Sequence, residues 1–154
     1  MPTEKRVQAA EAFWRDTESP EIATQHAEAM ILLARRLNFR AKSIQGMSIE
    51  RRAKHLAQLG DLSDALATRA LIAYHFAGQR PLMAAFLEAL GIAHDDGLIT
   101  VEEVVPPDAD GLAAAATKVK ATFPSEDVDL YLRTLLALDG QTWSNLAGLV
   151  PSAA

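Results

Sequence analysis

The sequence predicts an all-α, single-domain protein, built as a helical bundle or an orthogonal packing of about six to eight helices. Three observations lead to this class. Apolar residues recur every three to four positions through most of the chain, which is the period of an amphipathic helix. Glycine and proline interrupt the pattern at about one helix length. The chain of 154 residues is long enough to bury a core without cross-links.

The most apolar stretch of the chain is predicted to form a helical hairpin over residues 63–90. Ser63 is a favourable N-cap and Gly78 a favourable C′ residue for its first helix. Pro81 suits the opening turn of the second helix, which Gly91 ends. Because no other stretch is as apolar, we expect this hairpin at the centre of the core.

Three helices are predicted before the hairpin. The first has an apolar face made of Val7, Ala10, Phe13 and Trp14. The second is expected to start at Ser19-Pro20-Glu21, which supplies an N-cap, a rigid first residue and a favourable first-turn acid. Its apolar stripe consists of Ile22, His26, Ala29, Met30, Leu33 and Leu37. The third is expected to run from an N-cap at Ser48 to Leu59, with Gly60 ending it.

Residues 92–110 are predicted to form a long, acidic and partly ordered connector. Glycines, prolines and acids surround one short apolar run there. Thr100 and Glu103 have the spacing of a capping box, but the following prolines would stop such a helix within about two turns. An isolated strand over residues 98–101 is the alternative.

Two further helices and a short one are predicted after the connector. Asp110 is expected to cap an alanine-rich helix whose inward residues are Leu112, Ala115, Val119 and Phe123. Ser125 is expected to open the next helix, which Asp139-Gly140 closes. Its apolar face consists of Val128, Tyr131, Leu132, Leu135, Leu136 and Leu138. Trp143, Leu146 and Leu149 indicate a last short helix that folds back.

Composition limits the classes of protein to which the chain can belong. The absence of cysteine excludes disulfides, a thiol nucleophile and cysteine-ligated zinc. The first residues lack the apolar core of a signal peptide, and no apolar run approaches the ~18 residues of a membrane span. We therefore expect a cytoplasmic protein that does not contact a membrane.

The formal net charge of −5 is distributed unevenly. Residues 1–60 carry ten Lys or Arg against seven Asp or Glu, a net charge of +3. Residues 61–91 have a net charge of −1, and residues 92–154 carry three against ten, a net charge of −7. This gradient favours attraction between the two halves of the chain, in one molecule or in two. An anionic partner for the basic half is the alternative.

The segment 35–54 holds seven of the fifteen positive charges. Helices 48–59 and 63–77 have the order of a helix-turn-helix, but the second helix offers Arg69 as its one cation. An apolar helix cannot read a DNA groove. The segment is therefore predicted to be a solvated basic surface, and nucleic acid is not expected as a partner.

One short motif resembles a metal-binding loop. Asp96-Gly97-Leu98-Ile99, followed by Glu103, resembles the second half of an EF-hand loop. Calcium also needs oxygen ligands from the first half, where Ile92 and His94 occupy the first and third positions. We therefore predict no calcium binding.

The four histidines lack the paired spacing of a zinc site. A metal site would have to combine distant segments, for instance His26 or His75 with His94 and Asp95 or Asp96. We favour a hydrogen-bonded core position for His26 and exposed positions for the other three, because buried polar groups usually find a partner. No nucleophile elbow or phosphate-binding glycine loop is present, so no catalytic residue is assigned.

The leading functional hypothesis is a non-catalytic helical interaction or regulatory module that self-associates, because an apolar content of 49% leaves surface for a partner. The alternative is a small-ligand- or metal-binding protein, or an enzyme, with a pocket between the central hairpin and the acidic connector. Candidate ligand-binding residues for that pocket are His26, Arg69, Tyr74, His75, His94 and Asp95. No cofactor and no metal are predicted, and the expected partner is a second copy or another protein.

Arg69 falls on the apolar side of the first hairpin helix, close to Ala65, Ala73 and Phe76. Its neighbours one turn away carry no carboxylate, so we expect a partner from another segment, most readily the acidic C-terminal half. In the structural interpretation Arg69 ties the connector or the C-terminal helices to the hairpin, and truncation costs about 3–5 kcal/mol. In the functional interpretation it binds an anionic ligand.

Overall fold

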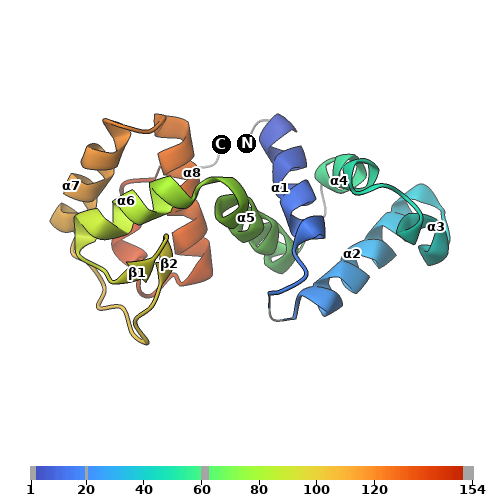
Figure 1. Cartoon of the computed structure of the whole chain (residues 1–154), viewed down its shortest axis with the longest axis horizontal. Helices are drawn as coiled ribbons and strands as arrows, with labels where there is room; N and C mark the ends of the chain where they lie inside the picture. Colours follow the sequence, from blue (N-terminus) through green and yellow to red (C-terminus); the bar gives the residue numbers. More distant parts are fainter. Residues whose placement is uncertain (1–2, 20, 60–62, 151–154) are drawn as a thin grey trace. The chain divides into compact units, whose positions relative to one another are not determined.

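The computed structural model describes residues 3–19, 21–59 and 63–150, and within them the protein is all-α, as predicted (Figure 1). The helices are α1 (Thr3–Arg15), α2 (Ile22–Leu37), α3 (Ala41–Gln45), α4 (Ile49–Ala57), α5 (Asp64–Gly78), α6 (Arg80–Leu90), α7 (Ala109–Lys120), α8 (Ser125–Leu138) and the 3-10 turn η1 (Ser144–Leu146). Two short strands, β1 (His94–Asp95) and β2 (Leu98–Ile99), accompany them. In the described part of the chain, no helix is long and apolar enough to cross a membrane.

The chain divides into two compact units, Met1–Ala77 and Gly78–Ala154. Both helices of the predicted hairpin are present. The backbone N–H of Leu66 donates to Ser63 Oγ at 3.3 Å, Pro81 lies in the first turn of α6, and Gly91 ends α6 at a φ of 72°. All but the last residue of α5 belongs to the N-terminal unit, and α6 belongs to the C-terminal unit. The prediction of a single domain stays a prediction.

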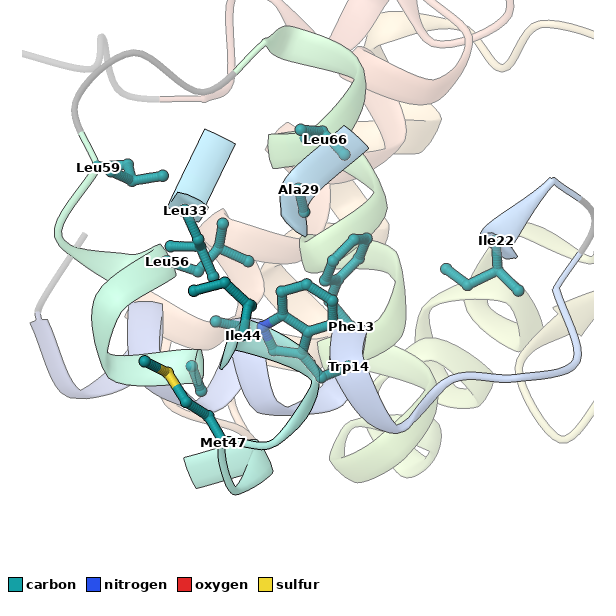
Figure 2. Close-up of a cluster of buried hydrophobic side chains, with 12 residues drawn as sticks. Phe13, Trp14, Ile22, Ala29, Leu33, Ile44, Met47, Leu56, Leu59 and Leu66 are labelled. Atoms are coloured by element: carbon teal, nitrogen blue, oxygen red, sulfur yellow. The ribbon is translucent and has the colours of Figure 1, made fainter. Parts of the chain in front are cut away.

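The N-terminal unit has an apolar core to which α1, α2, α3, α4 and α5 contribute. Phe13 and Trp14 pack edge to face with ring centroids 5.1 Å apart, and Figure 2 shows both rings inside this core. The helix α1 lies along α4, and Ser48 caps α4 by accepting the Arg51 N–H at 3.2 Å. The buried members are Ala10, Phe13, Trp14, Ile22, Ala29, Leu33, Ile44, Met47, Ala53, Leu56, Leu59 and Leu66.

The predicted start of the second helix was wrong in detail. The helix α2 begins at Ile22, and Glu21 precedes it in the left-handed region at a φ of 63° without a side-chain cap. The hydroxyl and N–H of Ser19 donate to Asp16 instead, so Ser19 closes the turn that leaves α1 and does not cap α2. Pro20 and the predicted helix end at Gly60 lie outside the described residues. The short α3 was not predicted because one turn carries no periodic pattern.

The C-terminal unit packs α6, α7 and α8 around a second core. The ring of Phe86 meets Tyr131 edge to face at 5.7 Å between centroids, and Trp143 lies 6.4 Å from Phe86. Lys120 Nζ of α7 lies 2.9 Å from Asp129 Oδ1 of α8 and joins the two helices. The other fully or nearly fully buried side chains include Leu82, Leu87, Leu112, Val119, Val128, Leu132 and Leu146.

The apolar run of the connector forms a paired strand. Neither the isolated strand nor the Thr100–Glu103 capping box is present, because residues 98–99 pair antiparallel with residues 94–95, with His94 opposite Ile99. Asp96 and Gly97 form the two-residue turn at positive φ values of 49° and 88°, which suits an Asp-Gly hairpin. The pattern that resembled an EF-hand loop is thus a tight β-hairpin. A Cβ on Gly97 would lie 2.7 Å from Met83 Cβ, so this turn sits directly against α6.

Two predicted caps were displaced. Asp108 caps α7 by accepting the Gly111 N–H at 2.6 Å, while Asp110 lies in the first turn. Asp108 and Asp110 have the same propensity to cap a helix. Asp108 is the cap because its backbone is extended, as an N-cap requires. Ser125 is the first residue of α8, and Pro124 occupies the cap position without a side-chain bond. The predicted last helix is a single 3-10 turn.

Candidate functional site

His26 occupies the partly buried core position that the sequence predicted. Its Nε2–H donates to the Phe13 carbonyl at 2.7 Å and so ties α2 to α1. Its ring meets Phe13 edge to face at 4.8 Å and lies 5.2 Å from Trp14, between centroids. The Arg52 guanidinium lies 5.1 Å from the Trp14 ring centroid. These contacts give His26 a structural role.

Arg69 finds its partner in the N-terminal unit. Its Nε–H donates to Gln25 Oε1 at 3.0 Å, which joins α5 to α2. Within the N-terminal unit the partner is an amide oxygen one residue before His26. The acidic partner from the C-terminal half stays a prediction. A hydrogen bond to a neutral amide contributes about 1 kcal/mol, so this bond alone implies a smaller cost of truncation than predicted. Burial raises the pKa of Asp16 in the same unit, whereas its hydrogen bonds and the charge of Arg69 lower it.

Tyr74 and His75 are neighbours on α5, with ring centroids 5.2 Å apart in an edge arrangement. His75 is 2% exposed, although the sequence analysis placed it on the surface. Its Nδ1–H donates to the Leu71 carbonyl at 2.7 Å, one turn earlier in the same helix. This local bond lets the imidazole enter an apolar environment that the residue type alone does not predict.

His94 and Asp95 form the first strand of the β-hairpin. Nδ1 of His94 accepts the Gly97 N–H at 3.1 Å, and Nε2 lies 3.4 Å from Glu88 Oε1 on α6. His94 therefore stabilises the turn and its contact with α6, while Asp95 is exposed. Among the residues that the structure describes, no group of three or more His, Asp or Glu side chains could hold a metal ion.

A hollow lies elsewhere, between α1, α4 and α5 of the N-terminal unit. We call it the apolar groove, and its volume is about 340 Å³. Four of the residues that line it, Phe13, Leu56, Leu59 and Leu66, are labelled in Figure 2. The residues that line it are Arg6, Ala9, Ala10, Phe13, Leu56, Ala57, Leu59, Leu66, Ala67, Ala70 and Leu71. None of the six predicted ligand-binding residues is among them.

Sequence reasoning missed the apolar groove because its depth depends on how three helices come together. Five of its eleven lining residues are alanine, at positions where a larger side chain would fill the space. The alanines of α1 and α5 follow a helical spacing, which was the one available signal. That spacing alone also fits close helix packing, so it does not predict a hollow.

A basic apolar patch lies at the end of α2 and just beyond it. Ile31 and Phe39 are large apolar side chains that are 51% and 48% exposed. Exposed cations lie near them along the chain. The patch consists of Ile31, Arg35, Arg36, Phe39, Arg40 and Lys42.

An acidic apolar segment lies in the C-terminal unit. Leu98, Val101 and Val105 are 47%, 42% and 84% exposed. Exposed carboxylates accompany them along the chain. The segment spans residues 95–105 and carries the acids Asp95, Asp96, Glu102 and Glu103.

Comparison with protein-family models, with curated proteins and with solved structures finds no match to this chain. Its function is therefore inferred from its own residues.

Proposed function

We propose that the chain is a non-catalytic helical interaction module that self-associates, with the acidic apolar segment of one copy against the basic apolar patch of another. One observation supports this proposal most strongly. Each unit exposes large apolar side chains in a stretch of chain with a net charge, and the net charge is positive at residues 31–42 and negative at residues 95–105.

The charge of the whole units adds to this complementarity. The N-terminal unit carries eleven Lys or Arg against nine Asp or Glu, and the C-terminal unit carries four against eleven. Opposite fields steer two copies into a head-to-tail encounter and disfavour contact between like units. The exposed Ile31, Phe39, Val101 and Val105 then lose contact with water, which is the main source of affinity.

The head-to-tail arrangement also has a consequence for assembly size. A contact between two different surfaces is heterologous, so each copy keeps one free patch and one free segment after the first contact. A closed ring results where the geometry closes, and an open chain where it does not. The proposed module therefore forms assemblies whose size depends on concentration.

Analytical ultracentrifugation over a concentration series at about 20 mM and 500 mM salt tests this proposal. Association is expected at low salt and is expected to weaken at high salt, because a Debye length of about 3 Å near 1 M screens exposed charges. Arg35→Glu with Arg40→Glu is expected to weaken association about tenfold or more. Arg51→Glu, an exposed arginine on α4 outside the patch, is the matched control.

A charge swap identifies the surfaces. Mixing the Arg35→Glu/Arg40→Glu variant with a Glu102→Lys/Glu103→Lys variant is expected to restore association, while each variant alone associates weakly. In the mixture the unaltered segment of the first variant meets the unaltered patch of the second, and the two reversed surfaces are complementary as well. A parent protein that stays monomeric at both salt concentrations would refute self-association. Association that survives both double reversals would refute the assigned surfaces.

A further inference from the structure

We propose that the apolar groove between α1, α4 and α5 is a binding site for an aliphatic chain with one anionic end, such as an alkyl carboxylate. The groove shares no residue with the basic apolar patch or the acidic apolar segment. The proposal is therefore independent of self-association.

The walls of the groove determine the body of the ligand. Its volume of about 340 Å³ is within the size of small-molecule sites, which span roughly 300–1,000 Å³. Ten of the eleven lining residues are apolar. Nine of those ten lie within helices, whose interior backbone groups bond within the helix and offer little to a polar ligand. A flexible hydrocarbon chain gains the most by entering such a space.

Arg6 determines the charge expected at one end of the ligand. It is the one charged residue of the lining, and no acid of the groove competes for it. Arg6 is exposed, and no ion pair or hydrogen bond of its side chain is found within the described part of the chain. A guanidinium presents a planar fork that matches a carboxylate with two parallel hydrogen bonds. One arginine and no second cation favour a single negative charge over a phosphate cluster.

The small alanine side chains of the lining leave room for the hydrocarbon chain of the ligand. Ala9 and Ala10 on α1 are nearly fully buried, while Ala67 and Ala70 on α5 are partly exposed to the groove. Each added methylene that enters the space is expected to raise the affinity about fourfold, until the groove is full. The affinity should therefore rise from hexanoate to octanoate and continue to rise with chain length until the groove is filled.

Isothermal titration with octanoate, octanol and octylammonium, together with amide chemical-shift mapping, tests the assignment. Each probe is used below the concentration at which it aggregates or separates from water. Octanoate is expected to bind about three- to fivefold more tightly than octanol, because an exposed charge pair adds only a modest gain. Octylammonium is expected to bind most weakly. The shifted amides should lie in α1, α4 and α5. Shifts confined to other helices, or no binding of any probe, would overturn the site.

Two variants separate the roles of charge and space. Arg6→Leu is expected to lower the affinity for octanoate to that for octanol and to leave octanol unchanged; an unchanged preference for octanoate would overturn the anionic end. Ala67→Leu is expected to fill the groove and to weaken both probes at least tenfold. Ala65→Leu, an exposed alanine of the same helix outside the lining, is the control. Full binding by a folded Ala67→Leu variant would overturn the location.

Discussion

Both units of the chain leave a helix through the same four-residue turn, an aspartate followed three residues later by a hydroxyl residue. Asp16 after α1 accepts the N–H groups of Glu18 and Ser19 at 3.1 Å, and the Ser19 hydroxyl as well. Asp139 after α8 accepts the N–H groups of Gln141 and Thr142 at 3.2 Å, and the Thr142 hydroxyl at 2.6 Å. The turns that follow α1 and α8 thus have the same hydrogen-bond pattern.

The units differ in the contacts that join their segments. In the N-terminal unit, polar groups reach between distant segments, as in Arg69 to Gln25, His26 to the Phe13 carbonyl and Arg15 to Glu50 at 3.0 Å. In the C-terminal unit, Lys120 of α7 pairs with Asp129 of α8 at 2.9 Å, and His94 Nε2 lies 3.4 Å from Glu88 Oε1 of α6. Both units therefore use side-chain pairs between separate elements, and the C-terminal unit adds the close approach of Gly97 to α6.

The largest effect is expected when the central ring of each core is removed. Phe13→Ala and Phe86→Ala each delete a side chain that is at most 1% exposed, and each should lower the free energy of unfolding by about 3–5 kcal/mol. Hydrogen exchange of both variants then tests the single-domain prediction. A single domain requires Phe13→Ala to reduce protection in α6–α8 as well, whereas a loss confined to the described residues of the N-terminal unit, up to Ala77, would indicate two domains.

Gly97→Ala should lower the free energy of unfolding by about 2–4 kcal/mol. The new Cβ combines strain at a φ of 88° with a clash 2.7 Å from Met83 Cβ. Gly91→Ala is the matched control, because it has a φ of 72° and nothing within 4 Å of the new Cβ, so only strain of about 1 kcal/mol remains. Equal losses in chemical denaturation would show that close approach to α6 contributes no stability.

Arg69→Ala should lower the free energy of unfolding by about 1 kcal/mol, because it removes one hydrogen bond to a neutral amide. A double-mutant cycle with Gln25→Ala should give a coupling energy of about 0.5–1.5 kcal/mol. A loss of 3 kcal/mol or more in urea denaturation would mean that Arg69 has the charged partner which the sequence first indicated.

The smallest effect is expected from protonation of the two turn aspartates. Burial raises the pKa of Asp16, but hydrogen bonds from Ser19 and Glu18 lower it by more. The pKa of Asp16 is therefore below the ordinary 3.8. Bonds from Thr142 likewise hold the pKa of Asp139 low. Because both pKa values are depressed on folding, their stabilisation is present above pH 3.8 and is lost as the pH falls through the folded values.

Thermal unfolding between pH 5 and pH 2.5 measures this loss. Asp16→Asn and Asp139→Asn should each flatten the acid side of the profile slightly, and by similar amounts, since the two turns share their geometry. A much larger change for one variant would show that the two turns are not equivalent.

Sequence reasoning recovered the helices whose ends carry strong local signals. Ser48, Ser63, Pro81 and Gly91 all act at the predicted ends, since caps depend on a few adjacent residues. Where two candidates compete within a few residues, as at Asp108 and Asp110, backbone conformation decides and the sequence alone does not. The predicted start of α2 was wrong for a related reason, because the Ser19 hydroxyl donates a hydrogen bond to Asp16 and does not cap α2.

The candidate site was predicted less well than the fold. His26 was correctly expected to be hydrogen-bonded, because an apolar helical stripe implies burial. Gln25 as the partner of Arg69, and the apolar groove, both depend on which helix faces lie opposite each other. Residue spacing along one helix carries no information on that pairing.

The placement of the two tryptophans gives the protein an optical property of its own. Trp14 is 4% exposed in the N-terminal core and Trp143 is 3% exposed in the C-terminal core, and the sequence contains no others. A buried indole emits at a shorter wavelength than a hydrated one. Trp14→Phe therefore leaves an emission signal that reports on residues 78–154 alone, and Trp143→Phe one that reports on residues 1–77, without any added dye.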